Sequence, residues 1–176
     1  MSERRVATGG SQERSDGQVP LEEAFESLYS MEFTMVYRVT ALVARDRQAA
    51  EEATQEAFAK ALERWPTLAG QPWAGAWVTK VAVNEAKRAR ASRWKVVPLD
   101  RHDEAQEADW GSILVLRAAI LHLSRRQRDA VILYYIRDEP LAVVARVMRC
   151  RVGTVKSHLS RARESLREIL GAEDES

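Results

Sequence analysis

The sequence predicts an all-α protein with two small helical domains joined by an acidic, flexible linker. Apolar residues recur at steps of three and four along most of the chain, as in amphipathic helices, and no alternating strand pattern appears. Charges are segregated into blocks along the sequence. With 176 residues, of which 45% are hydrophobic, the chain can bury one modest core or two small ones.

The charge blocks define the domain plan. The overall net charge is only +1, which argues against a uniformly basic nucleic-acid binder. The blocks carry net charges of −4 (residues 21–68), +5 (69–95), −4 (96–112) and +7 (113–170). Two basic blocks separated by an acidic spacer indicate two DNA-contacting modules joined by a segment that DNA would repel.

The N-terminal domain is predicted to span residues 21–95, after a disordered, polar tail over residues 1–20. Its first helix starts at Leu21 and continues, or is followed by a second helix, over residues 31–43. The next helix is expected over residues 48–65, with Phe58 and Leu62 on its buried side. Glu52, Gln55, Glu56 and Glu63 share another face, which is either solvated or a docking surface for a basic partner.

Pro66 is expected to end that helix, and residues 67–75 to form a loop. A basic helix is predicted over residues 76–94, with Trp77 pointing inward. Trp73 lies in the loop, where it either caps the bundle or stacks on bases beside the basic helix, as in proteins that hold single strands.

Residues 96–111 lack apolar periodicity and are predicted to be the linker, and residues 171–176 an acidic tail. The second domain, residues 112–170, is expected to contain a helix ending near Leu123, another over residues 126–135, and a helix-turn-helix.

The helix-turn-helix prediction rests on a short apolar helix, residues 141–148, a tight turn, residues 149–152, and a second helix. The second helix has an apolar stripe formed by Val152, Val155, Leu159, Ala162, Leu166 and Ile169. Its other face is rich in hydrogen-bond donors that suit phosphates and base edges. The alternative is a solvated basic surface.

Several classes of function are disfavoured. Cys150 is the single cysteine, so no internal disulfide can form, and His102, His122 and His158 have no metal-ligand spacing. No catalytic residues, metal site or cofactor are predicted, and an enzyme is not expected. Without a membrane-length apolar run or a signal peptide, the expectation is a soluble cytoplasmic protein.

Three motifs resemble the extracytoplasmic-function (ECF) class of bacterial sigma factors, in the sigma-70 family. Residues 50–58 (AEEATQEAF) and 77–84 (WVTKVAVN) are similar to stretches of sigma region 2, and residues 152–163 (VGTVKSHLSRAR) are similar to region 4. The resemblance covers residues 21–170. It implies that the chain binds core RNA polymerase, through the β′ clamp helices and the β flap, and directs promoter-specific initiation.

The resemblance also implies roles for individual residues. Polymerase docking would fall to Glu52, Gln55, Glu56 and Phe58, and capture of the melted minus-ten strand to Trp73, Asn84, Lys87 and Arg88. The residues that would face the duplex minus-thirty-five element are Arg151, Thr154, Lys156, Ser157, His158 and Arg161. Promoter DNA is therefore an expected partner, and an anti-sigma factor a further candidate.

Two departures from the family pattern affect local structure. Ser124 stands where the family often has proline, and Arg149 occupies a common glycine position in the turn. A non-glycine residue in a left-handed turn position costs about 1–2 kcal/mol. The alternative function is a stand-alone helix-turn-helix regulator whose N-terminal bundle binds a ligand or dimerises.

Overall fold

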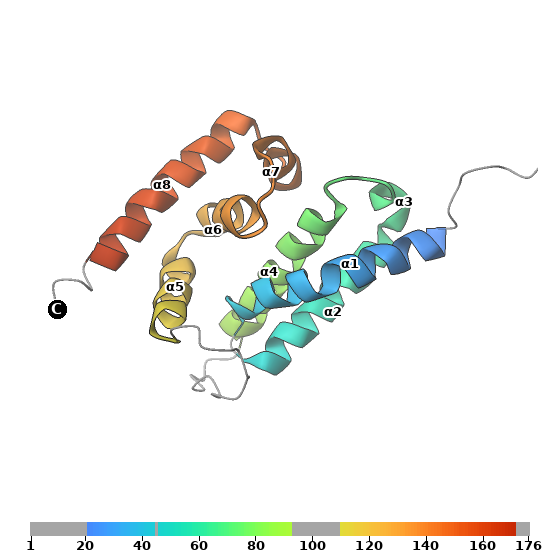
Figure 1. Cartoon of the computed structure of the whole chain (residues 1–176), viewed down its shortest axis with the longest axis horizontal. Coiled ribbons are helices and arrows are strands. Elements are labelled where there is room, and N and C mark those ends of the chain that lie inside the picture. The colour runs from blue at the N-terminus through green and yellow to red at the C-terminus, as the bar shows by residue number, and fades with distance from the viewer. Residues whose placement is uncertain (1–20, 45, 93–109, 172–176) are drawn as a thin grey trace, which may run out of the picture.

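The computed structural model describes residues 21–44, 46–92 and 110–171, which are almost wholly helical and contain no strand (Figure 1). This confirms the all-α prediction. The predicted tail over residues 1–20, nearly all of the predicted linker, and residues 172–176 lie outside the described residues.

The N-terminal domain consists of α1 (Leu21–Ala41), α2 (Arg47–Glu63), α3 (Trp65–Leu68) and α4 (Ala74–Ser92). The apolar pattern that allowed one helix or two produces a single continuous α1. Asp46 caps α2 by accepting a hydrogen bond of 2.8 Å from the Ala49 amide. A core of apolar residues from all four helices, including Val36, Phe58 and Val78, closes the bundle. Leu62 was predicted to be buried, but it is 55% exposed and lies at the C-terminal end of α2.

The predictions that Pro66 ends a helix over residues 48–65 and that residues 67–75 form a loop were wrong in part, because α2 ends at Glu63 and a short helix, α3, follows it. Pro66 lies in the first turn of α3, where its missing amide and fixed φ are tolerated because the first helical amides have no partner within the helix. Trp65, at the start of α3, is 6% exposed, and its indole donates a hydrogen bond to the Leu21 carbonyl. Burial of this tryptophan fixes α3 against the start of α1.

The C-terminal domain contains α5 (Trp110–His122), α6 (Arg125–Val131), η1 (Ile132–Ile136), α7 (Leu141–Met148) and α8 (Val152–Gly171). Ser124 caps α6 through a reciprocal capping box with Gln127, so the serine in place of the family's proline still starts a helix. The segment predicted as one helix over residues 126–135 changes at Ile132 into a π-helical turn. A left-handed residue, Asp138, then redirects the chain toward α7.

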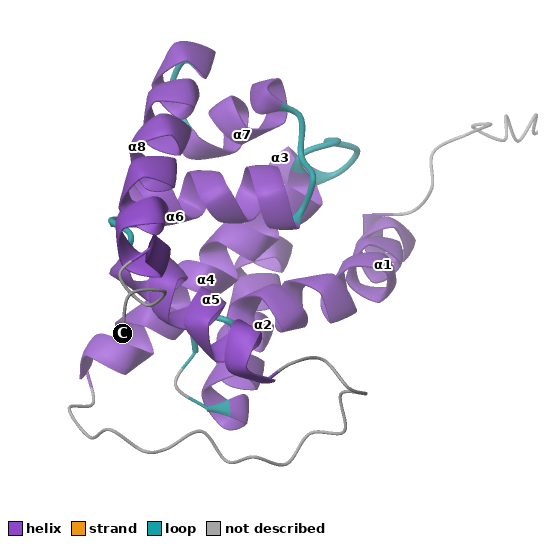
Figure 2. Cartoon of the chain, turned by 60° about the vertical axis from the view of Figure 1, so that its left-hand side comes forward, coloured by secondary structure: helices purple, strands orange, loops and turns teal. Residues whose placement is uncertain are grey.

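The two domains pack against each other, which the sequence did not predict. Ala76 of α4 lies in one apolar core with Leu133, Val144 and Val155 of the C-terminal domain. In a second core, Val39 and Val83 from α1 and α4 meet Ile120 and Ile132. Both views show α6 and α7 beside α4 (Figures 1 and 2). The described residues therefore form one body in which the domains share apolar surface.

Two adjacent ionisable side chains of α6, Arg128 and Asp129, are buried near this interface between the two domains. Asp129 of α6 is 2% exposed, and neither carboxylate oxygen has a hydrogen-bond partner. Burial raises the pKa of Asp129 above its ordinary value of 3.8, although Lys80 and neighbouring arginines oppose the shift. Because the folded chain then binds the proton more tightly than the unfolded chain, the free energy of unfolding falls as the pH rises above 3.8 through the folded pKa.

Asp129→Asn is expected to raise the free energy of unfolding at pH 7 by about 1–3 kcal/mol, because the amide cannot ionise and so avoids the cost of burying an unpaired charge. The gain should shrink toward zero as the pH falls below the folded pKa, since the wild-type carboxyl is then neutral. Urea unfolding across this pH range measures the difference. Asp138→Asn, at an exposed left-handed position, is the control; an equal and pH-independent gain in both variants would contradict the prediction.

Candidate polymerase and nucleic-acid interfaces

The carboxylate and amide face of α2 is open to solvent. Glu52, Gln55 and Glu56 are all exposed, whereas Phe58 is 3% exposed. Phe58 packs against Tyr29 and Phe33 of α1, with ring centroids 4.7 and 6.0 Å apart. A direct contact with a partner is therefore open to the first three side chains, whereas Phe58 belongs to the core of the bundle.

Glu56 is held in place by its neighbours. The Lys60 ammonium lies 2.9 Å from the carboxylates of both Glu56 and Glu85, so one cation ties α2 to α4. Hydrogen bonds from Lys60 to Glu56 and then to Glu85 raise the pKa of the lysine. Glu56 is still exposed, with 53% of its side chain accessible. The Glu56 carboxylate is therefore paired with Lys60 and still open to solvent.

The residues predicted to hold the minus-ten strand are spread along the length of α4 and do not form one cluster. Trp73 precedes the helix, whereas Arg88 lies about 20 Å further along the axis, at 1.5 Å per residue. Trp73 is partly buried and donates a hydrogen bond of 3.1 Å to Gln71. Lys87 is partly buried, and Arg88 is exposed with its guanidinium 3.3 Å from Glu85. A ligand touching both ends would be extended, as a single strand is.

Part of this face is occupied by the C-terminal domain. The Arg125 guanidinium donates a hydrogen bond of 3.0 Å to the Asn84 side chain, and Lys80 donates one of 2.9 Å to the Val147 carbonyl. The guanidinium of Arg146 lies over the Trp73 ring, 5.4 Å from its centroid. Sequence reasoning missed these partners, because helical periodicity carries no information about residues so far apart in the chain.

A cleft of about 1020 Å³ opens where the loop before α4 faces the turn between α7 and α8. Its lining includes Arg64, Arg146, Arg149 and Arg151 together with Trp73 and Trp77. None of the described residues that line it is acidic. The chemistry of this cleft favours anionic ligands with flat rings.

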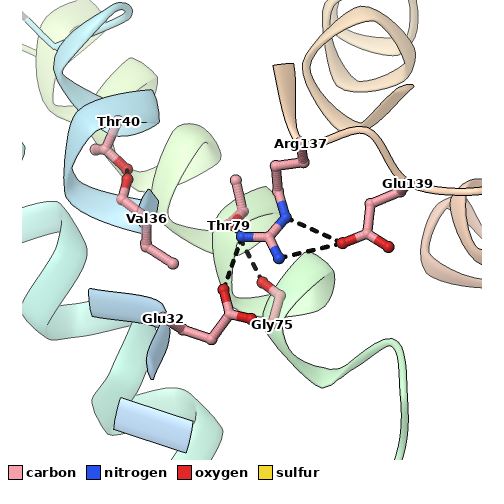
Figure 3. A network of polar contacts seen from close by, with 7 residues as sticks. All are labelled: Glu32, Val36, Thr40, Gly75, Thr79, Arg137 and Glu139. Carbon is pink, nitrogen blue, oxygen red and sulfur yellow. Dashed lines mark hydrogen bonds and ion pairs between the residues drawn. The ribbon is translucent and has the colours of Figure 1, made fainter. Parts of the chain in front are cut away.

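A polar network also crosses the interface between the N-terminal and C-terminal domains (Figure 3). Arg137, after η1, is 2.9 Å from the Glu32 carboxylate of α1 and donates a hydrogen bond of 2.9 Å to the Thr79 hydroxyl of α4. Its other terminal nitrogen pairs with Glu139 at 3.1 Å. Only 7% of the Arg137 side chain is accessible. None of these residues was singled out from the sequence.

The helix-turn-helix forms as predicted, with α7, a turn and α8 in order. Val155, Leu159 and Ala162 of α8 are buried against the domain. Val152, expected on the same stripe, is 39% exposed because it lies at the helix end beyond the core. The predicted minus-thirty-five residues that are exposed are Arg151, Thr154, Lys156, Ser157 and Arg161, and His158 is half-buried. The start of α8 is therefore a donor-rich surface open to a ligand.

Arg149 ends α7 in the left-handed conformation, with φ of 53°. We expect Arg149→Gly to raise the free energy of unfolding by about 1 kcal/mol, because glycine adopts this conformation without the steric cost of a Cβ. Thermal or urea unfolding measures the change. Arg149→Ala removes the same charge but keeps the Cβ, so an equal gain in both variants would show that charge rather than backbone strain is responsible.

The described residues hold no group of three or more histidine, cysteine, aspartate or glutamate side chains placed to bind a metal. None of the helices that the structure describes is long and apolar enough to cross a bilayer.

Comparisons with known proteins place both domains in one family. Residues 28–96 match the family model for sigma-70 region 2, and residues 113–166 match that for sigma-70 region 4. The ECF RNA polymerase sigma factor SigM of Mycobacterium tuberculosis is 27% identical over 176 residues, covering 94% of this chain and 90% of the relative. The RNA polymerase sigma-E factor of Streptomyces coelicolor is 30% identical over 130 residues, covering 71% of this chain and 73% of the relative.

A solved structure shares the fold. The sigma factor RpoE from Bartonella quintana, solved in complex with the anti-sigma factor NepR, superposes with a TM-score of 0.64 at 23% sequence identity. The match covers 84% of this chain and 96% of the solved chain.

Proposed function

Because the chain belongs to the ECF sigma factors of the sigma-70 family, we propose that it binds core RNA polymerase and directs initiation at a specific set of promoters. Sigma factors are DNA-binding initiation proteins rather than enzymes, so the work is done by binding energy alone. The chain acts in the cytoplasm, where its polymerase and promoters are found. The observation that carries the proposal is the presence of both sigma regions on one chain, at residues 28–96 and 113–166.

Docking on polymerase uses the exposed face of α2, where Glu52, Gln55 and Glu56 meet basic and polar groups of the β′ clamp helices. The C-terminal domain also contacts the β flap. Charge complementarity of this kind steers encounter and fixes the register of the complex.

Promoter recognition uses two chemistries. The start of α8 enters the major groove of the minus-thirty-five element, where Lys156, Ser157 and Arg161 supply donors to phosphates and base edges. The face of α4 holds the melted minus-ten strand by stacking on Trp73 and by charge. The Arg149 and Arg151 side chains add phosphate contacts beside the turn, so duplex affinity should fall steeply with salt.

The experiment that tests the proposal is run-off transcription with purified core RNA polymerase on a library of random promoters. Specific transcripts that depend on added protein establish the activity and deliver the promoter sequence. If core polymerase gives no specific transcript while the chain alone binds duplex DNA, the stand-alone regulator replaces this proposal. The match of residues 28–96 to sigma region 2 disfavours that alternative.

An anti-sigma factor is a proposed further partner. Exposed apolar side chains remain on the described surface, among them Leu21 at 57% and Met31 at 72%, both on α1. Such side chains suit a protein partner that covers them.

A further inference from the structure

The cleft between the loop before α4 and the α7–α8 turn concentrates positive charge. Four guanidinium groups line it, those of Arg64, Arg146, Arg149 and Arg151. Within the described residues none of the four is paired with a carboxylate, whereas the Arg137 guanidinium lies against two glutamates. Like charges that share a cleft raise its positive potential, and a bound anion relieves their repulsion. The cleft therefore has the electrostatics of an anion site.

Aromatic rings lie directly beside these cations. The Arg64 guanidinium is over the Trp77 ring, 5.7 Å from its centroid, and the Arg146 guanidinium is over the Trp73 ring, at 5.4 Å. Both tryptophans are partly buried, so part of each side chain stays open to the cleft. Nucleic-acid bases stack on aromatic rings and on guanidinium planes alike. The cleft thus offers stacking surface next to charge.

Gln71 adds a group that can contact the edge of a base. It lines the same cleft, and its side-chain oxygen accepts a hydrogen bond of 3.1 Å from the Trp73 indole. The amide nitrogen of Gln71 has no hydrogen-bond partner within the part of the chain that the structure describes, and it can donate to a ring nitrogen or carbonyl of a base. A stacked base therefore has a polar partner within the cleft.

The size and walls of the cleft favour a small ligand. Its volume of about 1020 Å³ lies at the upper end of the range for small-molecule pockets, about 300–1,000 Å³. One wall comes from residues 64–77 and the other from residues 145–151. A single strand that follows α4 toward Arg88 extends about 16 Å beyond Trp77, at 1.5 Å per residue, and leaves the arginines of the second wall unused. A compact ligand can reach both walls.

We propose that this cleft binds a free nucleoside polyphosphate, with its base against the indoles and its phosphates on the arginines of both walls. Several phosphates are required, because four separate guanidinium groups offer more donors than one carboxylate or one phosphate can accept. A nucleoside triphosphate combines the ring, the edge and the charge in one molecule. The binding does not depend on the proposed function, since it requires neither polymerase nor promoter.

Equilibrium dialysis of the full-length chain with radiolabelled ATP or GTP, in buffer without magnesium, measures the binding. Adenosine carries only the ring and tripolyphosphate only the charge, so each should displace labelled ATP at least about tenfold less effectively than unlabelled ATP. Arg64→Ala and Arg146→Ala, one from each wall, should each weaken ATP binding about tenfold or more, because each removes charge-assisted hydrogen bonds. Both arginines are exposed, so neither change truncates a core side chain.

Arg167→Ala is the matched control. It removes the same charge from an exposed position of α8, about 22 Å along the helix from its start at Val152. This variant should bind ATP as the wild type does. Equal ATP binding by the wild type, both cleft variants and the control would place the nucleotide elsewhere and overturn the proposal.

A random-sequence single-stranded 30-mer, followed by fluorescence anisotropy, distinguishes a free nucleotide from a strand. If the cleft variants lose affinity for the 30-mer while the wild type binds neither ATP nor GTP, the cleft belongs to a strand and the proposal is refuted. Tripolyphosphate that competes as well as ATP would reduce the cleft to a general anion site, which also refutes it. Absence of ATP and GTP binding at millimolar concentration refutes it without further comparison.

Discussion

Glu56→Arg is expected to reduce run-off transcription about a hundredfold, the largest functional effect of any single exposed residue on α2. Reversal of a charge at a complementary interface replaces attraction with repulsion and costs several kcal/mol, and each 1.4 kcal/mol is a factor of about ten in affinity. The position magnifies the effect, because the Lys60 ammonium holds the Glu56 carboxylate at 2.9 Å and the arginine would face that lysine. Multi-round transcription at limiting protein concentration measures the loss.

Glu26→Arg is the matched control. It makes the same charge change at an exposed position of α1, away from the carboxylate and amide face of α2. The control should transcribe within a few-fold of wild type, and both variants should bind duplex promoter DNA as the wild type does. Equal transcription by Glu56→Arg and wild type would exclude this face of α2 as the polymerase contact.

Leu133→Ala is expected to lower the free energy of unfolding by about 2–5 kcal/mol, through lost apolar burial and the cavity left behind. Leu133 is fully buried in the π-helical turn, within the core shared by both domains. Since small domains have total stabilities of only about 5–15 kcal/mol, this single truncation removes a large fraction. Urea unfolding followed by circular dichroism measures the shift in midpoint.

Leu114→Ala removes the same atoms from a side chain of α5 that is 48% exposed, and should cost less than about 1 kcal/mol. The comparison separates core packing from general effects of losing a leucine in a helix. A cost for Leu133→Ala as small as that of the control would mean that the shared core does not form in solution.

The helices and their buried faces could be predicted because amphipathic periodicity is a local signal. The stripe of Val155, Leu159 and Ala162 predicted the buried side of α8, and the donors between them necessarily face outward. The left-handed conformation of Arg149 was expected from the resemblance instead, because this residue stands where the family commonly has glycine.

Other features depend on information that the local pattern lacks. A proline is found both after the end of a helix and in the first turn of one, so Pro66 alone does not distinguish the two. Burial of Trp65 against α1 decides that a new helix starts there. Glu32 and Arg137 lie 105 residues apart, and each looks like an ordinary charged residue in its own segment. Local patterns therefore predicted the two helical domains but not the interface between them.

The unbroken course of α8 has a mechanical consequence. Its 20 residues extend about 30 Å at 1.5 Å per residue, from the donors at its start to side chains that meet α5 near its end. Because the helix is continuous, a tilt of its first turn is transmitted to the contact with α5. If α8 binds duplex DNA as proposed, a spectroscopic probe on α5 would report the resulting change in the angle of α8.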